Sequence, residues 1–295
     1  MFRSILTVLR PHQWTKNLLL FAALIFAGDL GDRALLLLAV QGFFVFCLLS
    51  SATYVLNDIA DRDRDRMHPR KRTRPIASGA LPVPPALAIA IVLGGVGLLW
   101  AFRIHASFAW MAVGYFVLIL LYSVALKALV LVDVMVIAIG FVLRAVASVH
   151  VLRPAAPETD LSPWLLVCTF FLALFLALAK RRNEVAVLGS SAEEHRATLT
   201  EYPQSLVDAL IAIVTGSTAV SYAIYTIWPG TVEKVGSAGL VYTVPFVVYG
   251  LMRYLYLMFT GGRGGQPSRV LLTDLPLAIN ILLWVLTVLA VLYAA

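Results

Sequence analysis

The chain has 295 residues and a mean hydropathy of +0.89; 61% of the residues are hydrophobic and only 13% are charged. A soluble domain needs far more polar surface, so this composition excludes an ordinary water-soluble enzyme or binding module and predicts an integral membrane protein. The net charge of +7 gains meaning only when the charges are placed along the chain, and no nucleic-acid partner is expected.

Apolar stretches of the length that a membrane-spanning helix needs, about 20 residues, recur along the whole chain. They predict an all-α integral membrane protein, residues 1–295 forming a single domain, with about nine spans. No apolar segment followed by a small-residue cleavage site is found near the start, so no cleaved signal peptide is expected. The predicted spans are about 17–31, 34–56, 86–103, 106–125, 129–149, 163–180, 205–228, 238–259 and 272–293.

The Lys and Arg residues are distributed unequally between the two sides that these spans define. Most of them fall in loops on the side of the N-terminus, and because cytoplasmic loops carry an excess of Lys and Arg, the N-terminus is predicted to be cytoplasmic. The densest charged stretch, LNDIADRDRDRMHPRKRTRPIASG from Leu56 to Gly79, follows the second predicted span on that side. Acidic residues contribute little to topology, so its aspartates need another explanation.

The aspartates of this stretch have helical spacing. Asn57, Asp61 and Asp65 are four residues apart and would share one helix face, with Asp58 beside them. Like charges on one face repel, and the interleaved arginines are the only local compensation. Oxygen ligands in such an array suit Mg²⁺, which takes one or two carboxylates and completes its shell with water and substrate phosphates. The stretch predicts a site for Mg²⁺ and a diphosphate; the alternative is a solvated loop with Arg–Asp surface pairs.

Basic and polar residues recur at other predicted span ends on the same side. Arg10, Lys16 and Asn17 lie where the chain first reaches the membrane, and Lys127 lies between the fourth and fifth spans. After the sixth span the chain reads Lys180-Arg181-Arg182-Asn183-Glu184. Three consecutive cations at this point predict direct binding of a phosphate, with positive-inside flanking charge as the alternative.

Arg144 lies inside the predicted fifth span, eleven residues after Asp133 on the same helix face. A charge there costs a few kcal/mol unless it is paired or hydrated, so Arg144 predicts a polar cavity. Arg253 gives a weaker form of the same argument. Tyr115, Tyr222 and Tyr225 are interpreted as helix packing.

Two motifs resemble a known family. Asn57 to Asp65, NDIADRDRD, resembles the NDxxDxxxD motif of the UbiA superfamily of intramembrane prenyltransferases, and Arg72-x-Arg74-Pro-Ile-Ala-x-Gly79 resembles the segment that follows it. The resemblance covers essentially the whole chain. It implies a helical bundle with a polar cavity at the cytoplasmic face, and Mg²⁺ held by the aspartates and bridging the donor's diphosphate.

Ordinary members of that superfamily carry a second aspartate-rich motif where this chain has its basic run. There, and around Arg10 to Asn17, Tyr122 to Lys127, Tyr202 and the Gly-rich stretch 261–274, the chain resembles the polyprenyl-phosphate phosphoribosyltransferase branch. This resemblance implies Mg²⁺-dependent transfer of 5-phosphoribosyl from phosphoribosyl diphosphate (PRPP) to a decaprenyl or other polyprenyl phosphate. Diphosphate is released, and the product would feed arabinan precursors of the cell wall.

The expected site combines these residues. Metal ligands are Asn57, Asp58, Asp61 and Asp65; catalytic residues are Asp58, Asp61, Asp65 and Lys16; and substrate is bound by Arg10, Asn17, Arg72, Arg74, Tyr122, Lys127, Arg144, Lys180, Arg181, Glu184 and Tyr202. Expected partners are the soluble donor PRPP, the lipid acceptor and the bilayer of the inner (plasma) membrane, and the apolar exterior would also permit a homo-oligomer. Two alternatives stay open: an ordinary prenyltransferase with an aromatic or lipid acceptor, and a membrane transporter.

Overall fold

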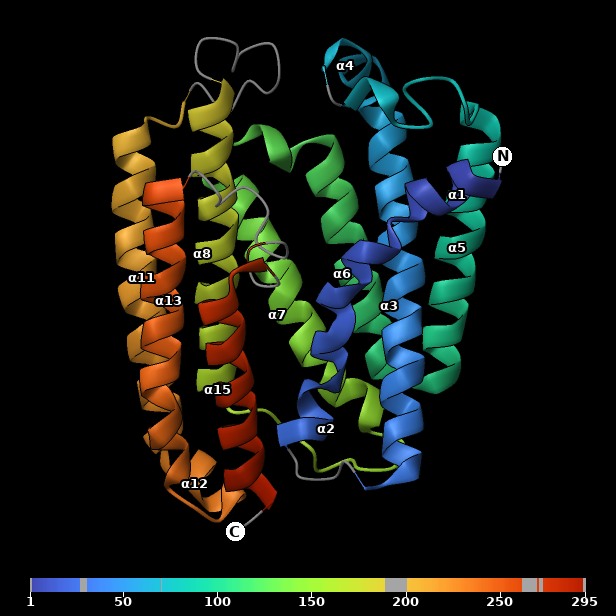
Figure 1. Cartoon of the computed structure of the whole chain (residues 1–295). Coiled ribbons are helices and arrows are strands. Elements are labelled where there is room, and N and C mark those ends of the chain that lie inside the picture. The colour runs from blue at the N-terminus through green and yellow to red at the C-terminus, as the bar shows by residue number, and fades with distance from the viewer. Residues whose placement is uncertain are drawn as a thin grey trace. The chain divides into compact units, whose positions relative to one another are not determined.

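Figure 1 shows the chain as a computed structural model. The structure describes residues 2–26, 31–69, 71–188, 201–261, 270 and 273–293, and within these ranges every regular element is a helix. The chain divides into two compact units. Unit 1 comprises Met1–Ile25, Asp29–Val136 and Gly140–Asp160, and unit 2 comprises Phe26–Gly28, Ile137–Ile139 and Leu161–Ala295.

The first half of the chain is organised around one long helix, α3, which packs against α5, α6, η1 and α1. Asp32 caps the start of α3, because its Oδ1 accepts hydrogen bonds from the backbone N–H groups of Ala34 at 2.7 Å and Leu35 at 3.1 Å. The elements of this half are α1 Phe2–Leu9, the 3₁₀ helix η1 Pro11–Phe21, α2 Ala22–Phe26, α3 Arg33–Ala60, α4 Arg62–Met67, η2 Lys71–Thr73, α5 Val83–Ile104, α6 Ala106–Val124, η3 Leu126–Ala128 and α7 Val132–Leu152.

Small and apolar residues fix the position of the segment that follows α4. A Cβ atom at Gly97 of α5 would lie 2.9 Å from Cδ2 of Leu49 of α3, so glycine permits the close approach of these two helices. At the α4 end, Ile76 and Leu81 of the connecting turn are buried in a cluster with Val55 of α3. This burial holds the turn, and therefore the Arg74 that precedes it, against the end of α3.

Unit 2 is a second group of helices, in which α8 packs along α11, and α13 packs against α11 and α15. Tyr222 joins three of its elements, because its hydroxyl accepts a hydrogen bond from Trp284 Nε1 at 2.8 Å and lies 2.8 Å from Thr243 Oγ1. Tyr225 belongs to the same buried cluster, as the packing interpretation predicts. The elements are α8 Pro163–Leu188, α11 Gln204–Ile227, α12 Pro229–Val235, η5 Gly239–Thr243, α13 Val244–Gly261 and α15 Leu275–Tyr293.

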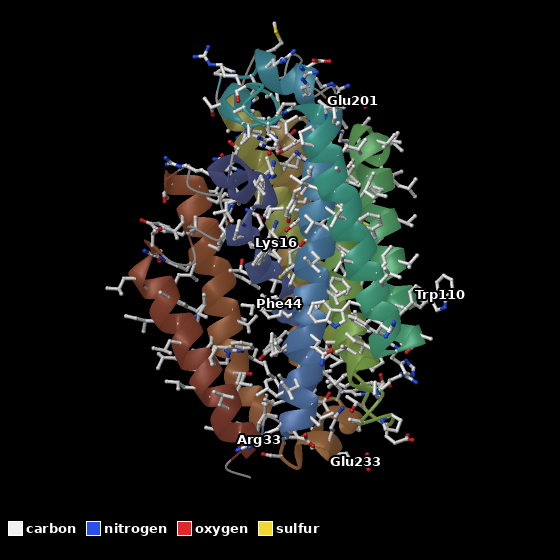
Figure 2. All side chains as sticks on the ribbon, turned by 90° about the vertical axis from the view of Figure 1, so that its right-hand side faces the viewer. Lys16, Arg33, Phe44, Trp110, Glu201 and Glu233 are labelled. Atoms are coloured by element: carbon white, nitrogen blue, oxygen red, sulfur yellow. The ribbon has the colours of Figure 1, made fainter. Side chains whose placement is uncertain are left out.

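Eight helical segments among the described residues are long and apolar enough to cross a membrane. They confirm the prediction of a multi-pass helical membrane protein, and apolar side chains such as Trp110 project outward from the helices, as expected of a lipid-facing surface (Figure 2). The count of nine is not confirmed: the first predicted span, 17–31, covers part of η1 and all of α2, and residues 27–30 lie outside the described ranges. That residues 1–295 form a single domain stays a prediction.

Candidate active site

The acidic stretch lies at the junction between α3 and α4. Asp61 ends α3 and begins α4, with φ −92° and ψ 5°, so the helix is interrupted in the middle of the motif. Asn57 Nδ2 donates a hydrogen bond to Asp61 Oδ2 at 3.2 Å, which confirms that these two residues share a face. The N–H of Asp65 still donates to the carbonyl of Asp61 at 2.8 Å, so the helical four-residue spacing is kept across the interruption. Among the described residues, however, the side chain of Asp65 makes no hydrogen bond with Asn57 or Asp61.

Arg74 instead connects Asp65 to Asp58. Its Nη1 donates to Asp58 Oδ1 at 3.0 Å and to Asp65 Oδ2 at 2.6 Å. Both carboxylates are buried, with side chains 3% and 4% exposed, whereas the guanidinium-bearing side chain is 28% exposed. A second guanidinium, that of Arg10, donates from Nη2 to the same Asp58 Oδ1 at 2.6 Å. Burial of the two carboxylates is therefore compensated by arginines from outside the motif.

Lys127 completes this arrangement. It lies in η3, between α6 and α7, and its Nζ is 2.6 Å from Asp61 Oδ1. The contacts form two groups at the junction of α3 and α4, one of Arg10, Asp58, Arg74 and Asp65 and the other of Asn57, Asp61 and Lys127. We call these seven residues together the charged cluster. The expectation that interleaved arginines compensate the motif is wrong for these carboxylates; Arg66 pairs with the exposed Asp63 at 3.7 Å and donates to the carbonyl of Ala77.

The backbone at Arg10 is strained. Arg10 has φ 52° and ψ 58°, the left-handed conformation that L residues other than glycine, asparagine and aspartate seldom adopt. Its guanidinium also lies 5.2 Å from the ring centroid of Tyr54 in α3. The strain persists because the side chain is held by Asp58 and Tyr54, and strain of this kind gathers at functional sites.

Arg144 lies in α7 and is 5% exposed. Its Nε donates to Asn17 Oδ1 at 2.8 Å, its Nη1 to the carbonyl of Gly140 at 2.9 Å, and its Nη2 to the hydroxyl of Tyr115 at 2.7 Å. Asn17 in turn donates to Ser50 Oγ of α3 at 3.3 Å. Arg144 thus ties η1, α6 and α7 together.

The contacts of Arg144 add to what the sequence indicated for Tyr115 and for Arg144 itself. Tyr115, interpreted as packing, also accepts a hydrogen bond from Arg144 and lies with its ring centroid 4.5 Å from that guanidinium. The hydrogen bonds of Arg144 go to Asn17, Gly140 and Tyr115, not to Asp133, which lies about 16 Å away along the helix at 1.5 Å per residue. Substrate contact by Arg144 stays a prediction. No sequence spacing could reveal the link to Tyr115, since the two residues lie on different helices.

The basic run at the end of α8 belongs to unit 2. Glu184 pairs with two of the three cations that precede it, with Lys180 Nζ at 3.8 Å and with Arg181 Nη1. Lys180 is 55% exposed, whereas Arg181 is buried. Arg182 donates to Asp208 of α11 at 2.5 Å and lies 4.0 Å from the ring centroid of Phe259. Of the three cations, Lys180 is therefore the most accessible to a ligand.

The remaining predicted site residues are placed as follows. Lys16 and Arg72 are exposed, Tyr122 is half-buried and Tyr202 is buried. Arg253 is bound by both oxygens of Asp274, at 3.0 and 2.8 Å, which gives this cation of α13 a structural partner at the start of α15. Most of the Gly-rich stretch 261–274 lies outside the described residues.

The charged cluster has the ligand chemistry of a magnesium site. Among the described residues no three His, Cys, Asp or Glu side chains are grouped so that they could hold a metal ion as they stand. The cluster nevertheless gathers carboxylate and amide oxygens, the ligands that Mg²⁺ prefers. Both hydrogen bonds of Asp58 end on Oδ1, and that of Asp65 ends on Oδ2, so each of these carboxylates engages the arginines through one oxygen. The donor chemistry of these residues therefore suits a divalent cation, whose binding here stays a prediction.

Fold and cluster together define a multi-pass helical membrane protein with a carboxylate-rich site at the end of a span. The model of the UbiA prenyltransferase family matches residues 18–271, and the chain therefore belongs to this family. It is an integral membrane enzyme.

Relatives of known name extend over nearly the whole chain. The decaprenyl-phosphate phosphoribosyltransferase of Corynebacterium glutamicum is 32% identical, covering 98% of this chain and 87% of the relative, and that of Mycolicibacterium smegmatis is 31% identical, covering 98% and 92%. Among solved structures, a UbiA homologue from Archaeoglobus fulgidus bound to DMAPP and Mg²⁺ superposes with a TM-score of 0.74 at 20% identity, covering 99% of this chain and 100% of that one. The solved structure supports the fold. Both named relatives are decaprenyl-phosphate phosphoribosyltransferases, which form one branch of the family.

Proposed function

We propose that the enzyme transfers the 5-phosphoribosyl group of PRPP to a polyprenyl phosphate, decaprenyl phosphate in the first instance, at the cytoplasmic face of the plasma membrane. The observation that carries the binding of a metal-bound diphosphate is the charged cluster, in which three carboxylates are paired with three cations. The names of the full-length relatives support the choice of donor and acceptor.

The cluster suits a metal-bound diphosphate. Asp58, Asp61 and Asp65, with Asn57, are the proposed ligands of Mg²⁺, the metal present in related solved structures. Bound there, Mg²⁺ supplies Lewis-acid stabilisation of the negative charge on the leaving diphosphate. Arg10, Arg74 and Lys127 are the proposed donors to the remaining diphosphate oxygens, because charge-assisted hydrogen bonds from these cations to phosphate are strong.

The proposed reaction needs no nucleophilic side chain. The bond between ribose C1 and the diphosphate oxygen breaks, its electron pair leaves with diphosphate, and an oxygen of the acceptor phosphate forms the new bond to C1. A phosphate monoester is already an anionic nucleophile at neutral pH. The work of the protein is to hold two anions in a reactive pose and to stabilise the charge on the leaving group.

The basic run of unit 2 is the proposed site of a second phosphate, either the 5-phosphate of the donor or that of the acceptor. Lys180→Ala removes its most exposed cation, so we expect KM for one of the two substrates to rise about tenfold, because a charge-assisted bond to phosphate contributes about 1.5 kcal/mol. Steady-state kinetics with each substrate varied in turn measure the change. Lys234→Ala, which makes the same charge change at an exposed position of α12, is the control. Unchanged KM values for both substrates in the Lys180 variant would contradict this assignment.

A second activity is favoured by the family description, which names prenyl transfer. An ordinary prenyltransferase would move a prenyl group from its diphosphate to an aromatic or lipid acceptor, and the charged cluster could bind that diphosphate equally well. The basic run Lys180–Arg182 favours phosphoribosyl transfer, since it offers cations for an additional phosphate. The transporter alternative is wrong, because the chain is an enzyme of the UbiA family.

Metal removal tests the proposal in one assay. Purified protein in detergent receives PRPP labelled in the ribose, polyprenyl phosphate and Mg²⁺, and the label in the lipid fraction is counted. We expect transfer with Mg²⁺, none after EDTA, and recovery when Mg²⁺ is restored in excess. Transfer that continues unchanged in EDTA would refute the metal-dependent mechanism, and an absence of transfer under all conditions would refute the choice of substrates.

A further inference from the structure

Arg74 has an unusual position within the charged cluster. A single nitrogen, Nη1, donates to one oxygen of Asp58 and to one oxygen of Asp65, at 3.0 and 2.6 Å. A positive centre that bridges two buried carboxylates is the arrangement that a divalent cation would itself produce. Arg10 adds a second positive group on the same oxygen of Asp58.

The charges of the cluster are balanced, and this balance disfavours the binding of a divalent cation alone. The carboxylates of Asp58, Asp61 and Asp65 are matched by Arg10, Arg74 and Lys127. A divalent cation that entered alone would leave the cluster with an excess of positive charge, whose repulsion is strong in a partly buried site. A cation that arrives with an anionic diphosphate would leave the balance almost unchanged. The absence of a ready metal-holding group of acidic side chains among the described residues agrees with this reasoning.

We infer that, in the substrate-free enzyme, Arg74 occupies the place of the divalent cation between Asp58 and Asp65, so that cation and diphosphate bind only as a pair. On binding, the guanidinium leaves the carboxylates and donates to the diphosphate oxygens, for which its planar fork is well suited. Arg74 is thus a positioning residue that blocks the metal site in the absence of substrate. When substrate binds, its diphosphate takes the place of the two carboxylates as the partner of Arg74. The inference rests on the proposed function only in requiring a diphosphate ligand.

Binding of Mn²⁺ alone tests this inference without any turnover. Free Mn²⁺ is measured by electron paramagnetic resonance during titration of the purified full chain in detergent, with no substrate present. We expect Arg74→Gln to bind Mn²⁺ about tenfold more tightly than the unaltered enzyme, a difference of about 1.4 kcal/mol. With Mn²⁺ saturating, the same variant should bind inorganic diphosphate about tenfold more weakly. General damage to the site would weaken the binding of both Mn²⁺ and diphosphate. Tighter Mn²⁺ binding together with weaker diphosphate binding therefore indicates the loss of a blocking cation.

Arg64→Gln is the matched control, since Arg64 is exposed on α4 and its loss makes the same change in net charge. It should leave both affinities unchanged. Should Arg74→Gln fail to fold, Arg10→Gln takes its place, because Arg10 lies on the same oxygen of Asp58; it should tighten Mn²⁺ binding by a smaller factor. Mn²⁺ affinity in Arg74→Gln, or in Arg10→Gln where it takes its place, equal to or weaker than in the unaltered enzyme would overturn the inference. Because the readout uses no ribose donor, failure of phosphoribosyl transfer is a separate result.

Discussion

Replacing Asp61 by Asn is expected to lower the transfer rate at least about 100-fold, the scale of losing one group that stabilises charge in a transition state. Asp61 accepts from Asn57 and pairs with Lys127, so it is the carboxylate through which α3 meets η3. Its neutral replacement loses a proposed metal ligand and releases Lys127 from its position. The measurement is the initial rate of ribose label entering the lipid fraction, with both substrates saturating.

Asp63→Asn is the matched control for this result. Asp63 belongs to the same motif but is 89% exposed and pairs only with Arg66 among the described residues, at 3.7 Å. An exposed ion pair of this kind contributes little to stability, so Asp63→Asn should retain the transfer rate within about twofold. A rate in Asp61→Asn as high as in the Asp63 control would show that Asp61 has no catalytic part.

Arg144→Leu is expected to reduce both stability and activity. The substitution leaves Asn17 Oδ1 and the Tyr115 hydroxyl without their donor in a buried setting, at about 1–3 kcal/mol for each unsatisfied group. It also releases η1, the helix that follows Arg10, and a displacement of about 1 Å at a reacting centre can cost about 100-fold in rate. We therefore expect a lower unfolding temperature in detergent and a rate reduced about 100-fold in the protein that remains folded.

Arg153→Leu provides the comparison at the end of the same helix, because Arg153 follows α7 directly and is exposed. It should keep both stability and rate. Arg144→Lys distinguishes charge from geometry: a lysine retains the positive charge but cannot bind Asn17, Gly140 and Tyr115 together, so its rate should stay low. Full turnover in Arg144→Leu would show that the link between η1 and α7 is not required.

The sequence allowed the class of fold to be predicted, and it singled out as candidates the residues that the charged cluster brings together. The length of an apolar segment indicates directly whether it can span a membrane. The contact between Asn57 and Asp61 follows from their helical spacing. The interruption at Asp61 was not predicted, because the spacing of the motif is the same in a continuous helix and in one interrupted at a single residue. Arg10, Arg74 and Lys127 are among the predicted substrate-binding residues, but nothing local indicates which carboxylate each of them contacts.

The contacts that could not be predicted are those between residues far apart in the sequence. Lys127 and Asp61 are 66 residues apart, and Arg144 and Asn17 are 127 apart, so both contacts depend on how helices pack. Hydropathy likewise could not distinguish a span from η1, whose eleven residues wind as a 3₁₀ helix, a form that seldom extends beyond about four residues. In both cases tertiary contacts, which a single sequence does not display, decide the local structure.

The most direct test of the account offers both classes of donor to the enzyme at once. Purified protein receives PRPP labelled with ¹⁴C in the ribose and prenyl diphosphate labelled with ³H, together with polyprenyl phosphate, 4-hydroxybenzoate and Mg²⁺. The account predicts that ¹⁴C moves to the polyprenyl phosphate, that ³H stays in its donor, and that Asp61→Asn abolishes the transfer. Transfer of ³H to 4-hydroxybenzoate, with ¹⁴C left in PRPP, would contradict the account and identify a prenyltransferase.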